Sequence, residues 1–231
     1  MLKTVETFPY ELKFGKKTVK FRGWKTRDEK AYLILTESKE ELEDKDLYDT
    51  LVIPCIENKT MYFTDAELQM LIIEIRKKSL GESFDVKYIC KNDKCKTVND
   101  IQVQFDEIVD FKNDTVSNIK IDNMEIFFGE VKNQTLLQER TKNKTNVEKL
   151  FIEMVMRIEK LIIDDTVEDT FTYDEITEYI DDLDTKVFDK MIAYYTENLS
   201  SISLRGHLMC HRCGHDNEFI FDEIPNFLAG W

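Results

Sequence analysis

The sequence predicts an α+β fold in which helices pack with short β-hairpins. Some stretches place apolar side chains at helical spacing behind Thr–Glu capping boxes, and others alternate apolar and polar residues on both sides of a turn. The same order of strand, helices and cysteine-containing turn occurs twice in the chain. With 231 residues, 42% of them apolar, the chain can bury a core in one large or two small domains.

The chain is predicted to begin with a hairpin. Phe8–Phe14 and Thr18–Phe21 are β-rich runs, and Gly15-Lys16-Lys17 between them is a turn signal. A helix capped by Thr26 or Asp28 is expected next, beginning near Asp28. Its apolar side is predicted to consist of Ala31, Tyr32, Ile34 and Leu35.

The following residues are predicted to stay largely helical. The charged stretch Glu37–Asp46 is expected to be a loop or helix junction, and Leu47–Ile56 a further helix interrupted by Pro54. Thr64 and Glu67 then form a capping box that opens a helix ending at Gly81.

A cysteine-containing hairpin follows this helix. Ser83–Ile89 alternates as a strand, Cys90 and Cys95 bracket a polar turn, and Ile101–Phe105 alternates as the returning strand.

The second half predicts a similar series. The expected elements are a strand at Met124–Phe128, one long amphipathic helix at Val147–Ile163, a helix opened by Thr172 with Glu175, a helix at Lys186–Leu199, a strand at Ser201–Met209, a turn between Cys210 and Cys213, and a returning strand at Glu218–Phe221.

This repeated order predicts an internal duplication, with related halves at residues 1–111 and 112–231. The two halves match best after the cysteine turns, where the same tetrapeptide occurs in both. It is Phe105-Asp106-Glu107-Ile108 in the first half and Phe221-Asp222-Glu223-Ile224 in the second. The apolar end, Phe227–Trp231, is expected either to pack onto the fold or to dock on a partner.

The cysteine turns predict a zinc-ribbon-like metal site. Each turn presents two thiolates, as the tight knuckles of a zinc ribbon do, and Gly214 permits a positive φ after the second one. If the two hairpins pair about a pseudo-two-fold axis, Cys90, Cys95, Cys210 and Cys213 would bind one Zn²⁺. Alternatives are a C-terminal site made by Cys210, Cys213 and a histidine at 207, 211 or 215, or free thiols without a metal. Cys55 is expected to be a core residue.

Composition and motifs exclude several classes of function. A net charge of −14 disfavours nucleic acid and anionic membranes as the main partner, and no apolar stretch approaches the length of a membrane span. The opening residues, Met1–Tyr10, lack the pattern of a signal peptide. No phosphate-binding glycine loop, zinc-protease motif or nucleophile elbow occurs, so the sequence predicts a protein without enzymatic activity.

Two runs in the first half resemble a known family. Val19–Trp24 followed by Asp28-Glu29-Lys30, and Ile75–Glu82 followed by a strand and Cys90, resemble the T4-type phage baseplate hub assembly proteins. The resemblance covers Phe8–Val109. The chain departs from the family pattern at Gly23, where the family has Pro, and at Leu80, where it has Val; Asp28 replaces a Glu.

The resemblance implies a non-enzymatic structural or assembly role in the central hub of a contractile tail baseplate. Implied partners are other hub and tail proteins, with the tape measure protein as one candidate. The implied location is the host cytoplasm during assembly and then the virion tail. The alternative is a zinc-ribbon nucleic-acid-binding or transcription module, which Lys87, Lys91, Lys94 and Lys96 near the first turn favour.

Overall fold

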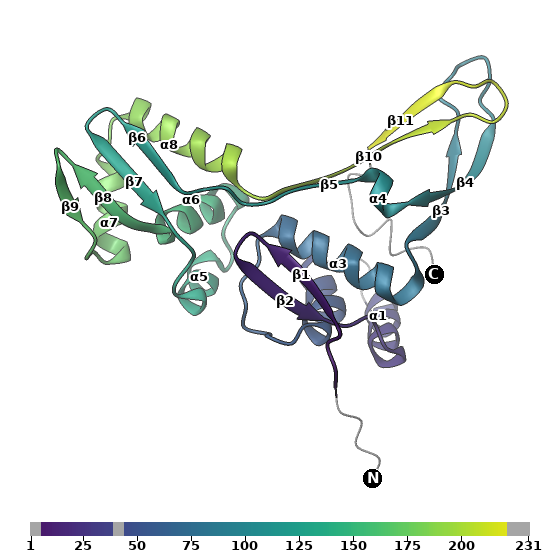
Figure 1. Ribbon diagram of the computed structural model, residues 1–231, viewed down its shortest axis with the longest axis horizontal. Helices are drawn as coiled ribbons and strands as arrows, with labels where there is room; N and C mark the ends of the chain where they lie inside the picture. Colours follow the sequence, from purple (N-terminus) through teal and green to yellow (C-terminus); the bar gives the residue numbers. More distant parts are fainter. Residues whose placement is uncertain (1–5, 39–43, 221–231) are drawn as a thin grey trace, which may run out of the picture. The chain divides into compact units, whose positions relative to one another are not determined.

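The computed structural model describes residues 6–38 and 44–220 and confirms an α+β fold built from helices and small antiparallel sheets (Figure 1). The chain forms two compact units. Unit 1 contains the residues before Thr60, Phe63–Asn113 and the residues from Ser200 onward, and unit 2 contains Thr60–Tyr62 and Asp114–Leu199.

These units do not follow the boundary between the two sequence halves, because the second cysteine hairpin belongs to unit 1. A relationship between residues 1–111 and 112–231 stays a prediction. Its tetrapeptide match at Phe221–Ile224 lies outside the described residues, as do the apolar end Phe227–Trp231 and residues 39–43 of the charged stretch.

Unit 1 opens with the predicted hairpin and helices. Its first elements are β1 (Tyr10–Phe14), β2 (Lys17–Phe21), α1 (Thr26–Ser38), α2 (Asp44–Leu47), a π-helical turn η1 (Tyr48–Val52), a 3-10 turn η2 (Ile53–Cys55) and α3 (Asp65–Leu80). The remaining elements are β3 (Ser83–Ile89), β4 (Val98–Gln104), α4 (Phe105–Ile108), β5 (Val109–Lys112), β10 (Ser201–Met209) and β11 (Asp216–Ile220).

The predicted capping box of α3 is confirmed. The Thr64 hydroxyl accepts the backbone N–H of Glu67, and the Glu67 carboxylate accepts the backbone N–H of Thr64 at 2.9 Å. Gly81 ends the helix with φ of 103°, a backbone conformation that residues with a Cβ rarely adopt. The boundaries of α3 therefore follow from local sequence signals.

The predicted apolar side of α1 is wrong in part. Tyr32 is buried, but Ile34 is 67% exposed. The buried side of the helix instead contains Asp28 and Tyr32, which are one turn apart. Asp28 faces inward because its carboxylate pairs with the buried guanidinium of Arg22 at 2.6 Å. An ion pair with Arg22, the residue directly after β2, therefore sets the rotation of the helix, and hydrophobic spacing alone does not reveal it.

Both cysteine hairpins are confirmed, and one of them joins a larger sheet. Strands β3 and β4 pair along their whole length, whereas β10 pairs with β11 on one side and with β5 on the other. Gly206 of β10 lies so close to α4 that an added Cβ would meet the Cγ2 of Ile108 at 2.8 Å. The second hairpin thus packs on the segment that follows the first.

Unit 2 is a four-stranded sheet with helices. Its elements are β6 (Asn118–Ile121), β7 (Met124–Phe128), α5 (Gln134–Thr141), α6 (Asn146–Met156), β8 (Ile158–Ile163), β9 (Thr166–Glu168), α7 (Tyr173–Asp181) and α8 (Thr185–Asn198), and its strands lie in the order β6-β7-β8-β9. The capping box predicted at Thr172 and Glu175 is confirmed.

The prediction of a single helix over Val147–Ile163 is wrong. The helix ends at Met156, and Ile158–Ile163 is strand β8, paired with β7. Phe127 pairs with Lys160 and Phe128 with Ile158, so Glu159 is an extra residue in a β-bulge. Because of this bulge, Ile158 and Leu161 face the same core although they are three residues apart, a spacing that imitates a helix.

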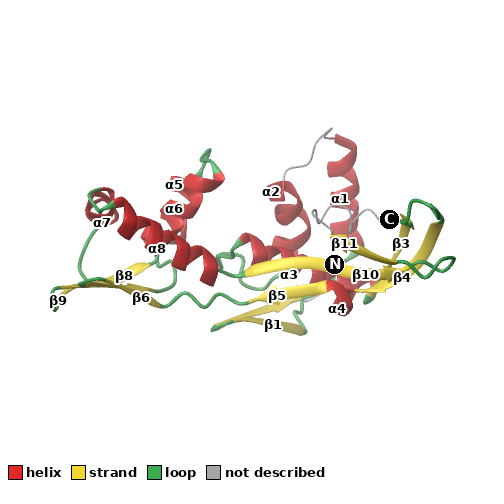
Figure 2. Cartoon of the chain, turned by 90° about the horizontal axis from the view of Figure 1, so that it is seen from above, coloured by secondary structure: helices red, strands yellow, loops and turns green. Residues whose placement is uncertain are grey.

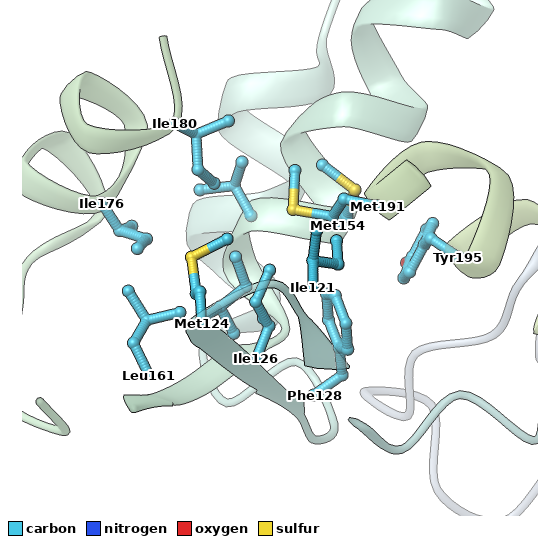
Figure 3. Packing of buried hydrophobic residues seen from close by; sticks show 12 residues of the cluster. Ile121, Met124, Ile126, Phe128, Met154, Leu161, Ile176, Ile180, Met191 and Tyr195 are labelled. Carbon is cyan, nitrogen blue, oxygen red and sulfur yellow. The ribbon is translucent and has the colours of Figure 1, made fainter. Parts of the chain in front are cut away.

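Helices α6, α7 and α8 cover one face of the sheet of unit 2 (Figure 2). Figure 3 shows side chains from these helices meeting alternate residues of β7. The buried cluster consists of Ile121, Met124, Ile126, Phe128, Met154, Val155, Ile158, Leu161, Ile176, Ile180, Met191 and Tyr195. Strand alternation on one side and helical spacing on the other therefore build one core.

None of the described helices is both long and apolar enough to cross a lipid bilayer.

Two valines of α6 test this packing with the same substitution. Val155 is 1% exposed and Val147 is 77% exposed. We expect Val155→Ala to lower the free energy of unfolding by about 2 kcal/mol, because it removes buried methyl groups and leaves a cavity. Val147→Ala should change it by less than about 0.5 kcal/mol. Urea unfolding followed by far-UV circular dichroism measures both, and equal effects would contradict the assigned face of α6.

Candidate metal centre

The four predicted cysteine ligands lie at the turns of the two hairpins in unit 1. Cys90 directly follows β3 and Cys210 directly follows β10, so both side chains are placed by the ends of paired strands. Cys95 and Cys213 lie within the turns that lead to β4 and β11. Figure 1 shows the two hairpins that contain these turns. The structure brings all four together, although the two pairs are more than a hundred residues apart in the sequence.

The sulfur atoms form a compact cluster with all four within 4.8 Å of one another. The Sγ atoms of Cys90 and Cys213 are 3.7 Å apart, and those of Cys95 and Cys210 are 3.8 Å apart. A disulfide needs about 2.05 Å between sulfurs, whereas a tetrahedral ion with metal–sulfur bonds of about 2.3 Å separates its ligands by about 3.8 Å. The spacing therefore fits four ligands of one tetrahedral metal ion.

The two turns have matching backbones despite different lengths. The residue after the second cysteine has a positive φ in both, 48° at Lys96 and 68° at Gly214. The backbone N–H of Cys90 donates to the carbonyl of Thr97 at 2.9 Å, and that of Cys210 donates to the carbonyl of His215 at 2.9 Å. The predicted conformation of Gly214 is confirmed, and Lys96 adopts the same conformation without being glycine.

Electrostatics at the cluster favour a bound cation. Burial acts to raise the pKa of the Cys210 thiol, but the backbone N–H groups of Cys213 and Arg212 point at its sulfur and lower the pKa to about 6. At Cys213 the N–H of His215 acts to lower the pKa, but loss of water and the three neighbouring sulfurs raise it to about 11. Four thiolates this close repel one another unless a cation compensates their charge.

Two asparagines belong to the site and were missed by sequence reasoning. Asn99 and Asn217 are completely buried, and each bonds the turn of the other hairpin. The sequence does contain a signal for their equivalent roles, because each asparagine is the fourth residue after the second cysteine of its turn. Tyr88 was missed as well; its hydroxyl donates to the carbonyl of Met209 at 3.0 Å and its ring packs edge-on against Phe219.

A comparison with protein families identifies the chain. The model of the family described as T4 bacteriophage base plate protein matches residues 5–229. The chain belongs to this family. The match extends the resemblance seen over Phe8–Val109 to both units and to both cysteine hairpins. Neither the curated proteins nor the solved structures contain a match to the chain.

Membership implies a structural role in the phage tail and contacts with other tail and baseplate proteins. Basic side chains near the cysteine turns of this baseplate protein lie close to carboxylates. Lys96 pairs with Asp93 at 2.8 Å, Lys87 lies 3.7 Å from Asp100, and His207 contacts Asp216 at 3.0 Å. Neighbouring carboxylates thus offset several of the basic side chains near the turns.

The three histidines of the alternative site and Cys55, the expected core cysteine, lie outside the cluster. Among the described residues, the group with metal-binding proximity contains no histidine, so the alternative site with His207, His211 or His215 is not formed. Cys55 is fully buried, and burial raises the pKa of its thiol to about 12. Its sulfur lies 3.4 Å from the guanidinium of Arg22, within the core of unit 1.

Metal content and stability test the cluster together. We expect the purified baseplate protein to contain about one equivalent of metal per chain, and Cys213→Ser to reduce it to near zero. Because Cys213 is exposed, this substitution removes little packing, so a fall in melting temperature reports the lost metal.

Cys55→Ala is the matched control for this measurement. It removes a buried thiol and should lower stability without changing the metal content. Elemental analysis and thermal unfolding with and without a strong chelator provide the readings. An absence of metal, together with a melting temperature that the chelator does not change, would refute the site.

Proposed function

We propose that this protein is a non-enzymatic component or assembly factor of the baseplate hub of a contractile phage tail, acting through protein–protein contacts. The observation that carries the proposal is the family match over residues 5–229, which includes both units. The hub assignment is supported by the resemblance of Val19–Trp24 and Ile75–Glu82 to hub assembly proteins.

We further propose that Cys90, Cys95, Cys210 and Cys213 hold one structural Zn²⁺. Four thiolates without an open ligand position are the donor set of structural rather than catalytic zinc sites. When bound, the ion supplies a cross-link between the two hairpins and compensates the charge of their thiolates. Structural zinc contributes about 10–16 kcal/mol of binding free energy to the folded state, so unit 1 would gain rigidity from it.

The proposed partners are other hub and tail proteins, with the tape measure protein as one candidate. The proposed location is the host cytoplasm during assembly and the baseplate afterwards. A rigid unit with a metal cross-link suits a role in which one surface must keep its shape while several partners dock.

A zinc-ribbon nucleic-acid module is the weaker candidate. It would need basic side chains free to neutralise phosphates, whereas Lys87 and Lys96 face nearby carboxylates. The net charge of −14 also opposes long-range attraction of nucleic acid.

Deletion of the gene from the phage tests the main proposal. We expect lysates that contain heads and free tail components but lack complete baseplates by electron microscopy, with infectivity reduced to background. A wild-type copy supplied in trans is the control and should restore particles.

Two biochemical readings separate the candidates. Co-purification with other baseplate proteins is expected, whereas retention on DNA that falls steeply with salt would favour the nucleic-acid module. Normal infectious particles from a phage that lacks the gene would contradict the structural proposal.

A further inference from the structure

The amide groups of Asn99 and Asn217 cross between the two cysteine hairpins. The backbone N–H of His211 donates to the Oδ1 of Asn99 at 3.0 Å, and the backbone N–H of Lys91 donates to the Oδ1 of Asn217 at 2.7 Å. The partners are 112 and 126 residues apart in the sequence, so neither bond is local. Each hairpin therefore holds the turn of the other.

The two bonds end at equivalent places. Lys91 directly follows Cys90, and His211 directly follows Cys210. In the strand register, Asn99 lies opposite Tyr88 and Asn217 opposite Leu208, each two residues before the first cysteine of its own hairpin. Each asparagine thus starts from the same position of a returning strand and reaches the same position of the opposite turn.

The amide nitrogens complete the arrangement. The Nδ2 of Asn99 donates to the carbonyl of Thr97 at 3.0 Å, and that of Asn217 donates to the carbonyl of His215 at 2.9 Å. These carbonyls also accept the backbone N–H groups of Cys90 and Cys210. Each asparagine therefore donates to a carbonyl of its own turn, and the first cysteine of that turn donates to the same carbonyl. Its Oδ1 accepts a backbone N–H from the turn of the other hairpin.

We propose that Asn99 and Asn217 are positioning residues of the four-cysteine site, which orient the Cys90 and Cys210 sulfurs before the metal binds. The inference rests on the proposed zinc site. The physical reason is the planarity of the peptide bond, because the N–H of the residue after a cysteine shares a plane with the carbonyl of that cysteine. Fixing this N–H restrains the backbone on one side of the cysteine, and the bond from the cysteine N–H to the Thr97 or His215 carbonyl restrains it on the other. Together they restrain the direction of the Cβ that carries the sulfur.

Complete burial makes the arrangement specific. Both asparagines are 0% exposed, so water cannot replace the lost partners when one side chain is removed. Removal of Asn99 should disturb Cys210, and removal of Asn217 should disturb Cys90. Either loss should therefore weaken the same site, although the two residues lie on different hairpins.

Metal affinity in single variants tests the inference. We would prepare metal-free wild-type protein, Asn99→Ala and Asn217→Ala, and titrate each with Co²⁺ and then Zn²⁺ in competition with a chromophoric chelator. Loss of a supporting contact around a metal site typically weakens affinity by about 10- to 100-fold, and we expect an effect of this size for both variants. The sulfur-to-cobalt absorption bands should also lose intensity or shift.

Asn118→Ala is the matched control. Asn118 is an exposed asparagine in unit 2 that bonds Glu125, so the same substitution there should leave the affinity at the wild-type value. Thermal unfolding of the metal-free variants is measured in parallel. A merely structural role would lower the melting temperature of metal-free and loaded protein alike and leave the affinity unchanged.

The outcomes separate the two proposals. Wild-type affinity in both asparagine variants would overturn this inference and leave the zinc assignment standing. Wild-type protein that binds neither ion would overturn the zinc assignment and this inference with it.

If an asparagine variant does not fold, amide hydrogen exchange in the wild-type protein still tests the inference. In zinc-loaded wild-type protein, the N–H groups of Lys91 and His211 should exchange more slowly than in an unstructured peptide, by about 100-fold or more. Exchange at the unstructured rate would mean that the crossed bonds do not form, and would overturn the inference without any variant.

Discussion

The convergence of four cysteine sulfurs constrains the rest of unit 1. Four sulfurs within 4.8 Å of one another must be held by their backbones, because thiolates repel one another and flexible turns would separate them. Several contacts provide this restraint. Strand β5 continues from the first hairpin and pairs with β10 of the second, Ile108 packs against Gly206, and the Tyr88 hydroxyl bonds the backbone beside Cys210. The metal site and the sheet around it therefore form one structure, in which a shift of either hairpin would spread through the other.

Unit 2 relates to this structure as an insertion. The chain leaves unit 1 after β5 and returns at β10, where Lys112 pairs with Ser201. The two connections thus start from neighbouring residues of one antiparallel pair, as the two ends of a hairpin loop do. Changes within residues 114–199 can alter unit 2 without disturbing the register of β5 and β10. This connectivity joins unit 2 to unit 1 through two neighbouring connections, in addition to the short segment Thr60–Tyr62.

Local signals predicted the parts of the fold that depend on neighbouring residues. The capping boxes at Thr64 and Thr172 and both cysteine hairpins follow from sequence within a few residues. The failures depend on distant partners: the bulge at Glu159 exists only against β7, and the rotation of α1 follows an ion pair with Arg22. The four cysteines could be grouped because their turns look alike. The equivalent positions of Asn99 and Asn217 were also visible in the sequence, but their bonds reach residues more than a hundred positions away, which no local pattern reveals.

The long separation between the cysteine pairs also affects synthesis of the protein. Cys95 and Cys210 are 115 residues apart, so the first hairpin leaves the ribosome well before the second exists. At about 5–20 residues per second, the wait is roughly 6–23 seconds. Unit 2, continuous from Asp114 to Leu199 apart from three residues, has time to fold in that interval. During that interval Cys90 and Cys95 have been synthesised and Cys210 and Cys213 have not. The order of translation thus makes closure of the sulfur cluster depend on the hairpin that is synthesised second.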